Sequence, residues 1–173
     1  MYSIIVPKNI KITLGKSFIK FEGPQGILVK KMGSLHIVKK DSTLFLLKKE
    51  NVNNATFQLS LITLKKLIQG ISRGFRSKLQ INGVGFKAIV QPTQLELKIG
   101  FSHLVTWKIP NNIKLITSKL KGTVLLIKGN EPYKVSQIAT QIRQFRVPDA
   151  YKGKGIKKYD EILRLKKGKR ESK

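Results

Sequence analysis

Thr43-Leu44-Phe45-Leu46-Leu47-Lys48 has a close counterpart in Thr123-Val124-Leu125-Leu126-Ile127-Lys128, about 80 residues further along the chain. Each stretch is a short apolar run, which is typical of a buried strand. A second short apolar run precedes each of them, at Leu35–Val38 and at Ile113–Ile116. The same pair of strands is therefore predicted twice, at a spacing that suits a whole small domain.

A helix is predicted after each of these strand pairs. Apolar residues step by three or four positions in both places, which makes one apolar stripe at the helical period. Asn53 or Asn54 would cap the first helix, and Pro132 fits the first turn of the second. The two stripes are Phe57, Leu61, Leu64, Ile68 and Ile71, and then Val135, Ile138, Ile142 and Phe145.

Each half also contains a predicted hairpin. The first hairpin turns at Gly23 and the second at Gly100, and both are flanked by alternating apolar residues. Between the halves, Leu79–Val90 reads as an opening strand pair with glycines at a bend. The flanking strands of the two hairpins are Phe18–Phe21, Ile27–Val29, Leu95–Ile99 and Val105–Ile109.

These patterns predict an α+β fold with two homologous small domains that arose by duplication. Each domain is expected to be an antiparallel-rich sheet packed on one helix. The predicted segments are residues 1–78, residues 79–147 and a basic C-terminal extension over residues 148–173. The alternative is that two similar α+β layers follow one another by chance.

The charge of the chain points to a polyanionic partner. Among 173 residues there are 35 lysines and arginines against 9 aspartates and glutamates, so the formal net charge is +26. Self-repulsion of this size works against the compact state, and a small-molecule enzyme rarely carries it. Nucleic acid is the commonest compensating polyanion. An apolar fraction of 40% still fits a packed core.

Several chemistries are excluded or disfavoured by what the chain lacks. It has no cysteine, so disulfides, thiolate nucleophiles and cysteine-based metal sites are excluded. No apolar run approaches the ~18 residues of a membrane span, and no signal or transit segment is recognised at the start of the chain. We therefore expect no membrane partner.

Three short motifs resemble functional sites without the required context. Gly83-Val84-Gly85-Phe86-Lys87-Ala88 fits a dinucleotide-binding pattern, but strand-like alternation follows where a helix is needed. Gly15-Lys16-Ser17 resembles the end of a phosphate-binding loop without its first glycine. His36 and His103 lie in different repeats, with no carboxylate cluster beside them.

Asp160 and Glu161 are adjacent carboxylates, whereas acid–base catalysis needs two that converge from different elements. Charge balance with neighbouring lysines explains them better. The sequence thus predicts no enzyme, no cofactor, no metal and no small-molecule substrate.

The region from Arg143 to Lys173 is densely basic. Tyr151-Lys152-Gly153-Lys154-Gly155 lies within it, and glycines between lysines let a backbone approach phosphates closely. The tyrosine ring could contact a sugar or a base. A solvated flexible tail is the simpler alternative, and it accounts well for the last residues only. We expect the region to be extended and mobile in the absence of RNA.

Pro148-Asp149-Ala150-Tyr151-Lys152-Gly153-Lys154-Gly155-Ile156 closely resembles the C-terminal signature of the large-subunit ribosomal protein six family. Gly100–His103 and Leu79–Ala88 resemble two further family segments. Ala150 stands where the family usually has proline, so the segment would be less rigid. The resemblance implies two homologous α+β domains, with large-subunit ribosomal RNA and neighbouring ribosomal proteins as partners.

The resemblance also implies where the protein binds. It places the contact near the sarcin–ricin region of the RNA, where translational GTPases dock, with Tyr151–Gly155 as an RNA-contacting signature. The competing function is that of another basic RNA-binding protein, such as a ribosome assembly factor. The candidate RNA-binding residues are Lys87, Arg143, Arg146, Tyr151, Lys152, Gly153, Lys154, Gly155, Lys157, Lys158, Arg164, Lys166, Lys167, Lys169 and Arg170.

The composition suggests a compartment. Lysine far outnumbers arginine, and isoleucine and asparagine are frequent, all of which A/T-rich codons favour. This resembles proteins encoded in organellar or A/T-rich bacterial genomes. The expectation is a mitochondrial ribosome, with a chloroplast ribosome or a bacterial cytoplasm as alternatives.

Overall fold

The helix predicted in the first half is α1, Asn54–Ser72. The computed structural model describes residues 2–15, 18–31, 35–40, 43–48, 52–118 and 122–168. All five residues of the predicted apolar stripe are buried on the inner face of α1. Asn53 is its N-cap, with a side chain that accepts a hydrogen bond from the backbone N–H of Ala55 at 3.3 Å. Periodicity and capping thus fix this helix as the sequence predicts.

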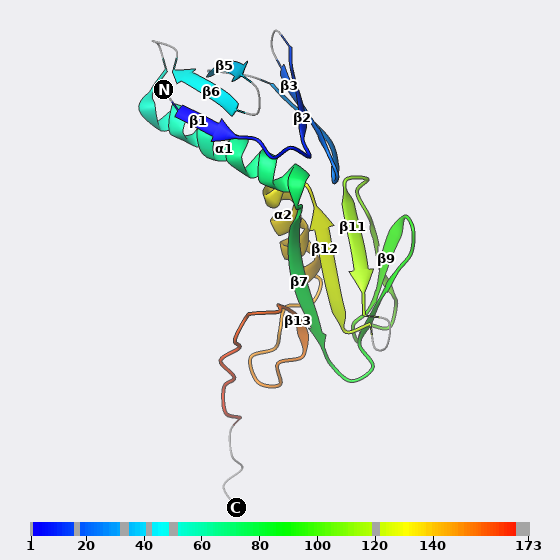
Figure 1. The fold of residues 1–173 in the computed structure, drawn as a ribbon. Helices are drawn as coiled ribbons and strands as arrows, with labels where there is room; N and C mark the ends of the chain where they lie inside the picture. The colour runs from blue at the N-terminus through cyan, green and yellow to red at the C-terminus, as the bar shows by residue number, and fades with distance from the viewer. Residues whose placement is uncertain are drawn as a thin grey trace, which may run out of the picture. The chain divides into compact units, whose positions relative to one another are not determined.

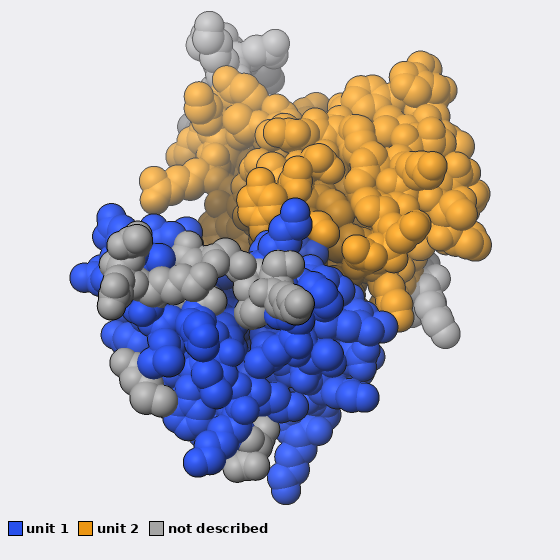
Figure 2. Space-filling view, turned by 90° about the horizontal axis from the view of Figure 1, so that it is seen from above, with its two compact units in different colours: residues 1–75, 130–132 blue, residues 76–129, 133–173 orange. Residues whose placement is uncertain are grey.

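By their contacts, the residues divide into two units, which Figure 2 colours separately. Unit 1 is Met1–Phe75 with Asn130–Pro132, and unit 2 is Arg76–Gly129 with Tyr133–Lys173. The segment boundaries predicted from the sequence stay predictions.

The strands of unit 1 form two antiparallel three-stranded sheets, in the orders β1-β6-β5 and β2-β3-β4. Helix α1 contacts β3 and β4 and runs beside β1 (Figure 1). Buried side chains such as Phe21, Leu44 and Ile71 join the sheets to the helix. The strands are β1 (Tyr2–Ile5), β2 (Lys11–Leu14), β3 (Phe18–Gly23), β4 (Gly26–Lys31), β5 (Leu35–Lys40) and β6 (Thr43–Lys48).

Unit 2 contains the second helix, α2 (Pro132–Gln144), and two sheets in the orders β11-β12-β7-β13 and β10-β9-β8. Pro132 begins α2 as predicted, and the helix stops one residue short of Phe145. The strands are β7 (Phe75–Asn82), β8 (Lys87–Val90), β9 (Gln94–Lys98), β10 (Val105–Lys108), β11 (Ile113–Thr117), β12 (Val124–Gly129) and β13 (Gly155–Lys158).

The two units repeat one topology. The order β1-β6-β5 returns as β7-β12-β11, and the order β2-β3-β4 returns as β8-β9-β10. The predicted α+β class is therefore confirmed, with two helices, antiparallel sheets and two similar halves. The stretch predicted as one opening strand pair is different: β7 pairs with β12 and β13, whereas β8 pairs with β9 in the other sheet. The glycine bend between β7 and β8 passes the chain from sheet to sheet.

The strand β13 is the largest departure from the sequence expectation. The sequence predicts that the region after Pro148 is extended and mobile. Gly155–Lys158 is extended, but it pairs in antiparallel register with the edge of β7. Ile156 is 0% exposed, and full burial of an isoleucine stabilises the fold by about 1.5–3 kcal/mol. The C-terminal region is thus partly a component of the unit 2 core (Figure 1).

Candidate RNA interface

The basic C-terminal region is anchored at β13. Ile156 pairs with Ile81 across the β7–β13 ladder, and its N–H donates a hydrogen bond to the carbonyl oxygen of Arg146 at 2.8 Å. One residue beyond the strand, the N–H of Tyr159 donates to the carbonyl oxygen of Lys78 at 2.9 Å. The Nζ atom of Lys78 lies 3.4 Å from the centroid of the Tyr159 ring. The backbone therefore has a fixed position on both sides of the strand.

A tight loop, Asp149–Lys154, precedes the strand. The carboxylate of Asp149 accepts a hydrogen bond from the N–H of Lys152, three residues further along the chain, at 2.7 Å. The carbonyl oxygen of Asp149 accepts from the N–H of Gly153, and that of Lys154 accepts from the N–H of Asp149, both at 3.0 Å. The loop is closed on itself, and Lys152 and Lys154 are exposed on it.

The two glycines of the loop have internal structural roles. Gly153 has a φ of +65° and Gly155 a φ of +145°, which side chains rarely adopt. A Cβ atom on Gly155 would lie 2.7 Å from the Cα atom of Pro148 and 2.8 Å from the carbonyl oxygen of Val147. Both glycines are buried, so in this structure they let the loop turn and close against its own backbone.

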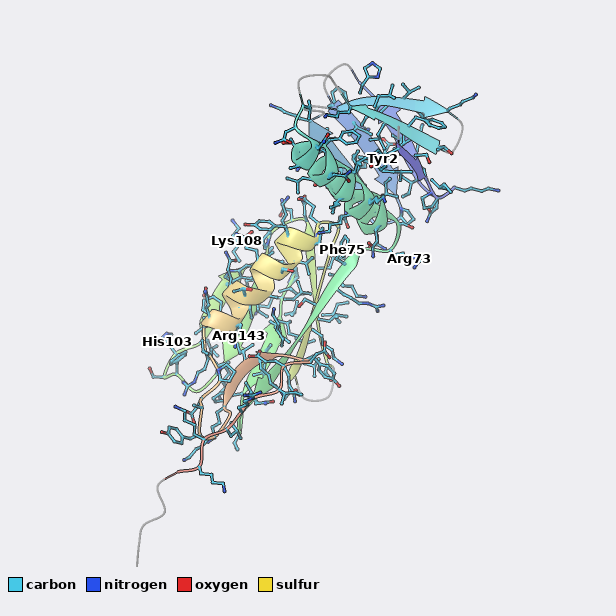
Figure 3. The ribbon with its side chains drawn as sticks, turned by 90° about the vertical axis from the view of Figure 1, so that its left-hand side faces the viewer. Tyr2, Arg73, Phe75, His103, Lys108 and Arg143 are labelled. Carbon is cyan, nitrogen blue, oxygen red and sulfur yellow. The ribbon has the colours of Figure 1, made fainter. Side chains whose placement is uncertain are left out.

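The two arginines at the end of α2 have protein partners. Arg143 lies in the last turn of the helix (Figure 3), and its Nη2 donates to Oε1 of Glu161 at 2.6 Å. The Arg146 guanidinium lies over two rings, 5.0 Å from the Phe101 centroid and 5.6 Å from the Phe86 centroid. Both arginines are half-buried. Their charges hold the C-terminal region and the β9–β10 turn against the helix end.

Glu161 is the acceptor that organises the residues after β13. Its Oε2 accepts from the N–H of Lys158 at 3.0 Å, and its carbonyl oxygen accepts from Nζ of Lys157 at 3.2 Å. The backbone hydrogen bond from Lys158 and the pairing with Arg143 lower the pKa of Glu161 below its usual range. The carboxyl group is therefore ionised at neutral pH.

Three of the remaining candidate cations line a groove. This cavity of about 810 Å³ lies between the β7–β8 turn, at Asn82–Val84, and the C-terminal region. Lys152, Lys154 and Lys157 line it together with Tyr159. The N–H of Lys166 donates to the carbonyl oxygen of Ala150 at 2.9 Å, so the chain folds back beside the loop. The exposed candidates are Tyr151, Lys152, Lys154, Lys158, Arg164, Lys166 and Lys167.

Three candidates lie elsewhere. Lys87 is exposed on β8, in the sheet β10-β9-β8, and does not line this groove. Lys169 and Arg170 lie outside the described residues. The structure therefore brings the loop lysines together and separates Lys87 from them.

Sequence reasoning missed the other wall of the groove. Asn82, Gly83 and Val84 line it from the β7–β8 turn, and Lys78 adds a cation above the Tyr159 ring. Only the pairing of β13 with β7 brings these residues to the C-terminal region. Gly83 and Gly85 are the one local signal at this wall. They predict a bend in the chain, but they do not predict that the bend lies beside the C-terminal region.

Within residues 2–168, less the gaps in the description, no cluster of three or more His, Asp or Glu side chains could hold a metal ion. Neither described helix is both long enough and apolar enough to cross a bilayer.

Residues 82–159 match the protein family described as Ribosomal protein L6. The large ribosomal subunit protein uL6 of Chlorobium chlorochromatii is 37% identical over 169 residues, which cover 96% of this chain and 93% of that protein. The uL6 protein of Parvibaculum lavamentivorans is 35% identical over 172 residues, covering 98% and 96%. That of Nitratiruptor is 46% identical over 102 residues, covering 59% and 56%.

Proposed function

Because the chain belongs to the ribosomal protein L6 (uL6) family, we propose that it binds and stabilises large-subunit ribosomal RNA through the exposed cations around the C-terminal groove. As a family member it is a structural, non-enzymatic protein of the large ribosomal subunit, with ribosomal RNA and ribosomal proteins as partners. Family membership favours this function over that of an assembly factor. The proposed contact lies near the sarcin–ricin region, beside the docking site of translational GTPases.

The observation that carries this proposal is the fixed loop that holds Lys152 and Lys154 outward. Its hydrogen bonds close it on Asp149, while the neighbouring glycines are buried. A loop whose backbone is fixed before binding loses less conformational entropy when its lysines contact phosphates than a free tail would. The loop therefore supports a defined contact, and not only a diffuse attraction.

Recognition by these lysines is expected to depend on RNA shape. A-form RNA hides its base edges in a deep major groove, so proteins contact phosphates and 2′-hydroxyl groups across folded surfaces. Lysines act there as point charges. Arg143 and Arg146, which have internal partners, would act by positioning the loop and the groove.

The test is the salt dependence of binding. Glutamine replaces Lys152, Lys154 and Lys158 together, and affinity for a transcript that contains the sarcin–ricin region is measured over a range of salt concentrations. Lys157 is left intact because its ammonium group bonds to Glu161. Loss of three phosphate contacts should weaken binding and flatten the slope of log affinity against log salt by roughly 2 to 3.

The matched control replaces Lys30, Lys31 and Lys66, three exposed lysines of unit 1, with glutamine. The same charge is removed, so an equal change in slope would assign the effect to net charge and would overturn the proposed interface. Cross-linking of the chain on purified large subunits tests the RNA region. Cross-links from residues 149–167 only to RNA outside the sarcin–ricin region would contradict that placement.

We also propose that the ribosome in question is mitochondrial, with chloroplast and bacterial ribosomes as the alternatives. The excess of lysine over arginine and the frequency of isoleucine and asparagine support an A/T-rich genome. The relatives named above are bacterial and indicate no organelle. Mass spectrometry of ribosomes from purified mitochondria of the source cells would test the proposal, and detection only in another compartment would contradict it.

A further inference from the structure

The repeated topology leaves one sheet edge covered in unit 2 and free in unit 1. In unit 2, β13 pairs with β7 and lengthens the sheet to four strands. In unit 1, β1 takes the place of β7, and among the described residues it ends its sheet. An edge strand presents unpaired N–H and C=O groups that can pair with another chain. Unit 2 therefore shows what an occupied edge looks like in this fold.

The helices show that the two edges correspond in detail. Both apolar stripes end with steps of three, four and three residues, so Ile68 of α1 corresponds to Ile142 of α2. Gln69 and Ser72 then stand where unit 2 has Arg143, in the last turn of α2, and Arg146, two residues beyond the end of α2. Both arginines contact the C-terminal region, Arg143 through Glu161 and Arg146 through Ile156.

Gln69 and Ser72 line a groove along β1 in unit 1. This cavity of about 800 Å³ lies between β1 and the second half of α1. Buried Ile4 and Ile68 form an apolar floor, and Ile5 at its edge is 79% exposed.

The groove has a defined length. At one end Nδ2 of Asn9 donates to Oγ of Ser72 at 3.5 Å. Beyond the other end Nε2 of Gln58 donates to the hydroxyl of Tyr2 at 3.2 Å. These contacts tie both ends of the β1 segment to α1, so the edge between them is a short and fixed template.

Strand β13 and the residues after it occupy the unit 2 edge, and their chemistry indicates what kind of segment would bind at the unit 1 edge. There an isoleucine, Ile156, is fully buried beside the edge strand, and a carboxylate five residues later, Glu161, pairs with a cation on the helix. The unit 1 groove offers the matching features: an apolar floor and two exposed cations, Lys65 on α1 and its C-cap residue Arg73, with no carboxylate in its lining.

We propose that the β1 edge of unit 1 binds an extended acidic peptide segment of a partner protein, which adds a strand beside β1. The segment carries a β-branched apolar residue over Ile4 and Ile68 and a carboxylate that reaches Lys65 or Arg73. Strand addition derives its affinity from main-chain hydrogen bonds and its specificity from alternate side chains. RNA would use the two cations but would gain nothing from the apolar floor or the strand edge.

Fluorescence anisotropy with the full-length protein tests this proposal. The probe is a labelled peptide of about ten residues that alternates valine and glutamate, long enough to span the edge. Its control alternates proline and N-methylglutamate, which keeps the charge but has no backbone N–H to donate to a ladder. The valine peptide should bind at least ~5-fold more tightly, and hydrogen exchange at Tyr2–Ile5 should slow when it binds. Equal affinity for the two peptides would overturn strand addition.

Two adjacent lysines of α1 provide a matched pair of variants. Lys65 lines the groove, whereas Lys66 is also exposed and does not line it. Lys65→Glu should weaken peptide binding about fivefold, as expected for loss of an exposed ion pair, and Lys66→Glu should leave it unchanged. Equal weakening of peptide binding by the two variants would show that net charge, and not the groove, determines the affinity, and it would contradict the proposal. Slowed exchange at Tyr2–Ile5 caused by an oligouridylate instead would assign the groove to RNA and contradict the proposal.

Discussion

Gly155 occupies a backbone position that has no room for a side chain. Its φ is +145°, and a Cβ atom would lie within 2.8 Å of backbone atoms of Val147 and Pro148. Gly155→Ala should therefore combine conformational strain with a clash that only backbone movement can relieve. We expect it to lower the free energy of unfolding by about 2 kcal/mol or more, measured by urea denaturation.

Gly85→Ala is the matched control for this prediction. Gly85 has a φ of +73°, but a Cβ atom on it would have no neighbour within 4 Å. Conformational strain alone should cost about 1–2 kcal/mol. Equal losses in the two variants would show that the close approach of Gly155 to Pro148 adds nothing.

Glu161 makes the stability of unit 2 depend on pH. Hydrogen bonding from the Lys158 N–H and the pairing with Arg143 lower its pKa in the folded state below the ordinary 4.5. A group with a lowered folded pKa contributes stability that is present above its unfolded pKa. That contribution is lost as the pH falls through the folded pKa. The pH series should therefore begin near neutrality and end below the folded pKa.

Urea unfolding across this series should show a fall in stability at acidic pH that Glu161→Gln reduces. The neighbouring Asp160→Asn is the control, because Asp160 is exposed and Glu161 alone pairs with Arg143. If Asp160→Asn removed the pH dependence and Glu161→Gln preserved it, the role assigned to the Arg143–Glu161 pair would be wrong.

At the scale of elements, β13 joins the basic C-terminal region to the core. Ile156→Ala removes a fully buried side chain, and we expect a loss of about 2–4 kcal/mol in the free energy of unfolding. Ile162→Ala is the same substitution at a site that is 91% exposed, and it should be nearly neutral. Denaturation of both variants checks this, and equal effects would contradict the burial of β13.

Most elements could be predicted from the sequence because they carry a local period. The stripe from Phe57 to Ile71 defines α1 without any knowledge of its neighbours. Strand β13 carries no such signal, since Ile156 is one apolar residue between glycine and lysines. Its strand state comes from the free edge of β7, a partner more than 70 residues away.

The candidate site could be predicted by residue type but not by role. A run of basic residues identified the exposed lysines of the groove. It could not separate Lys152, which is exposed, from Arg143, which is paired with Glu161. Such separation depends on contacts between α2 and the C-terminal region, which no local pattern encodes.

At the scale of the whole molecule, the duplication was predictable and the difference between its copies was not. Both halves carry the same succession of strand-like and helix-like apolar patterns. The same order of elements is therefore predicted in each half, in agreement with the shared strand orders. The covered edge of β7 and the edge of β1, which is unpaired within the described part of the chain, differ through long-range pairing. This asymmetry separates the region proposed to bind RNA from the edge proposed to bind a peptide.

The pairing of β7 with β13 has a consequence for synthesis of the chain. Strand β7 opens unit 2 and β13 lies near its end, so a nascent polypeptide must wait for Gly155–Lys158 before that sheet is complete. A product released early, at Pro148 for example, would keep a bare β7 edge, which invites association between copies. Completion of the last segment therefore covers an edge at which newly made chains could otherwise associate.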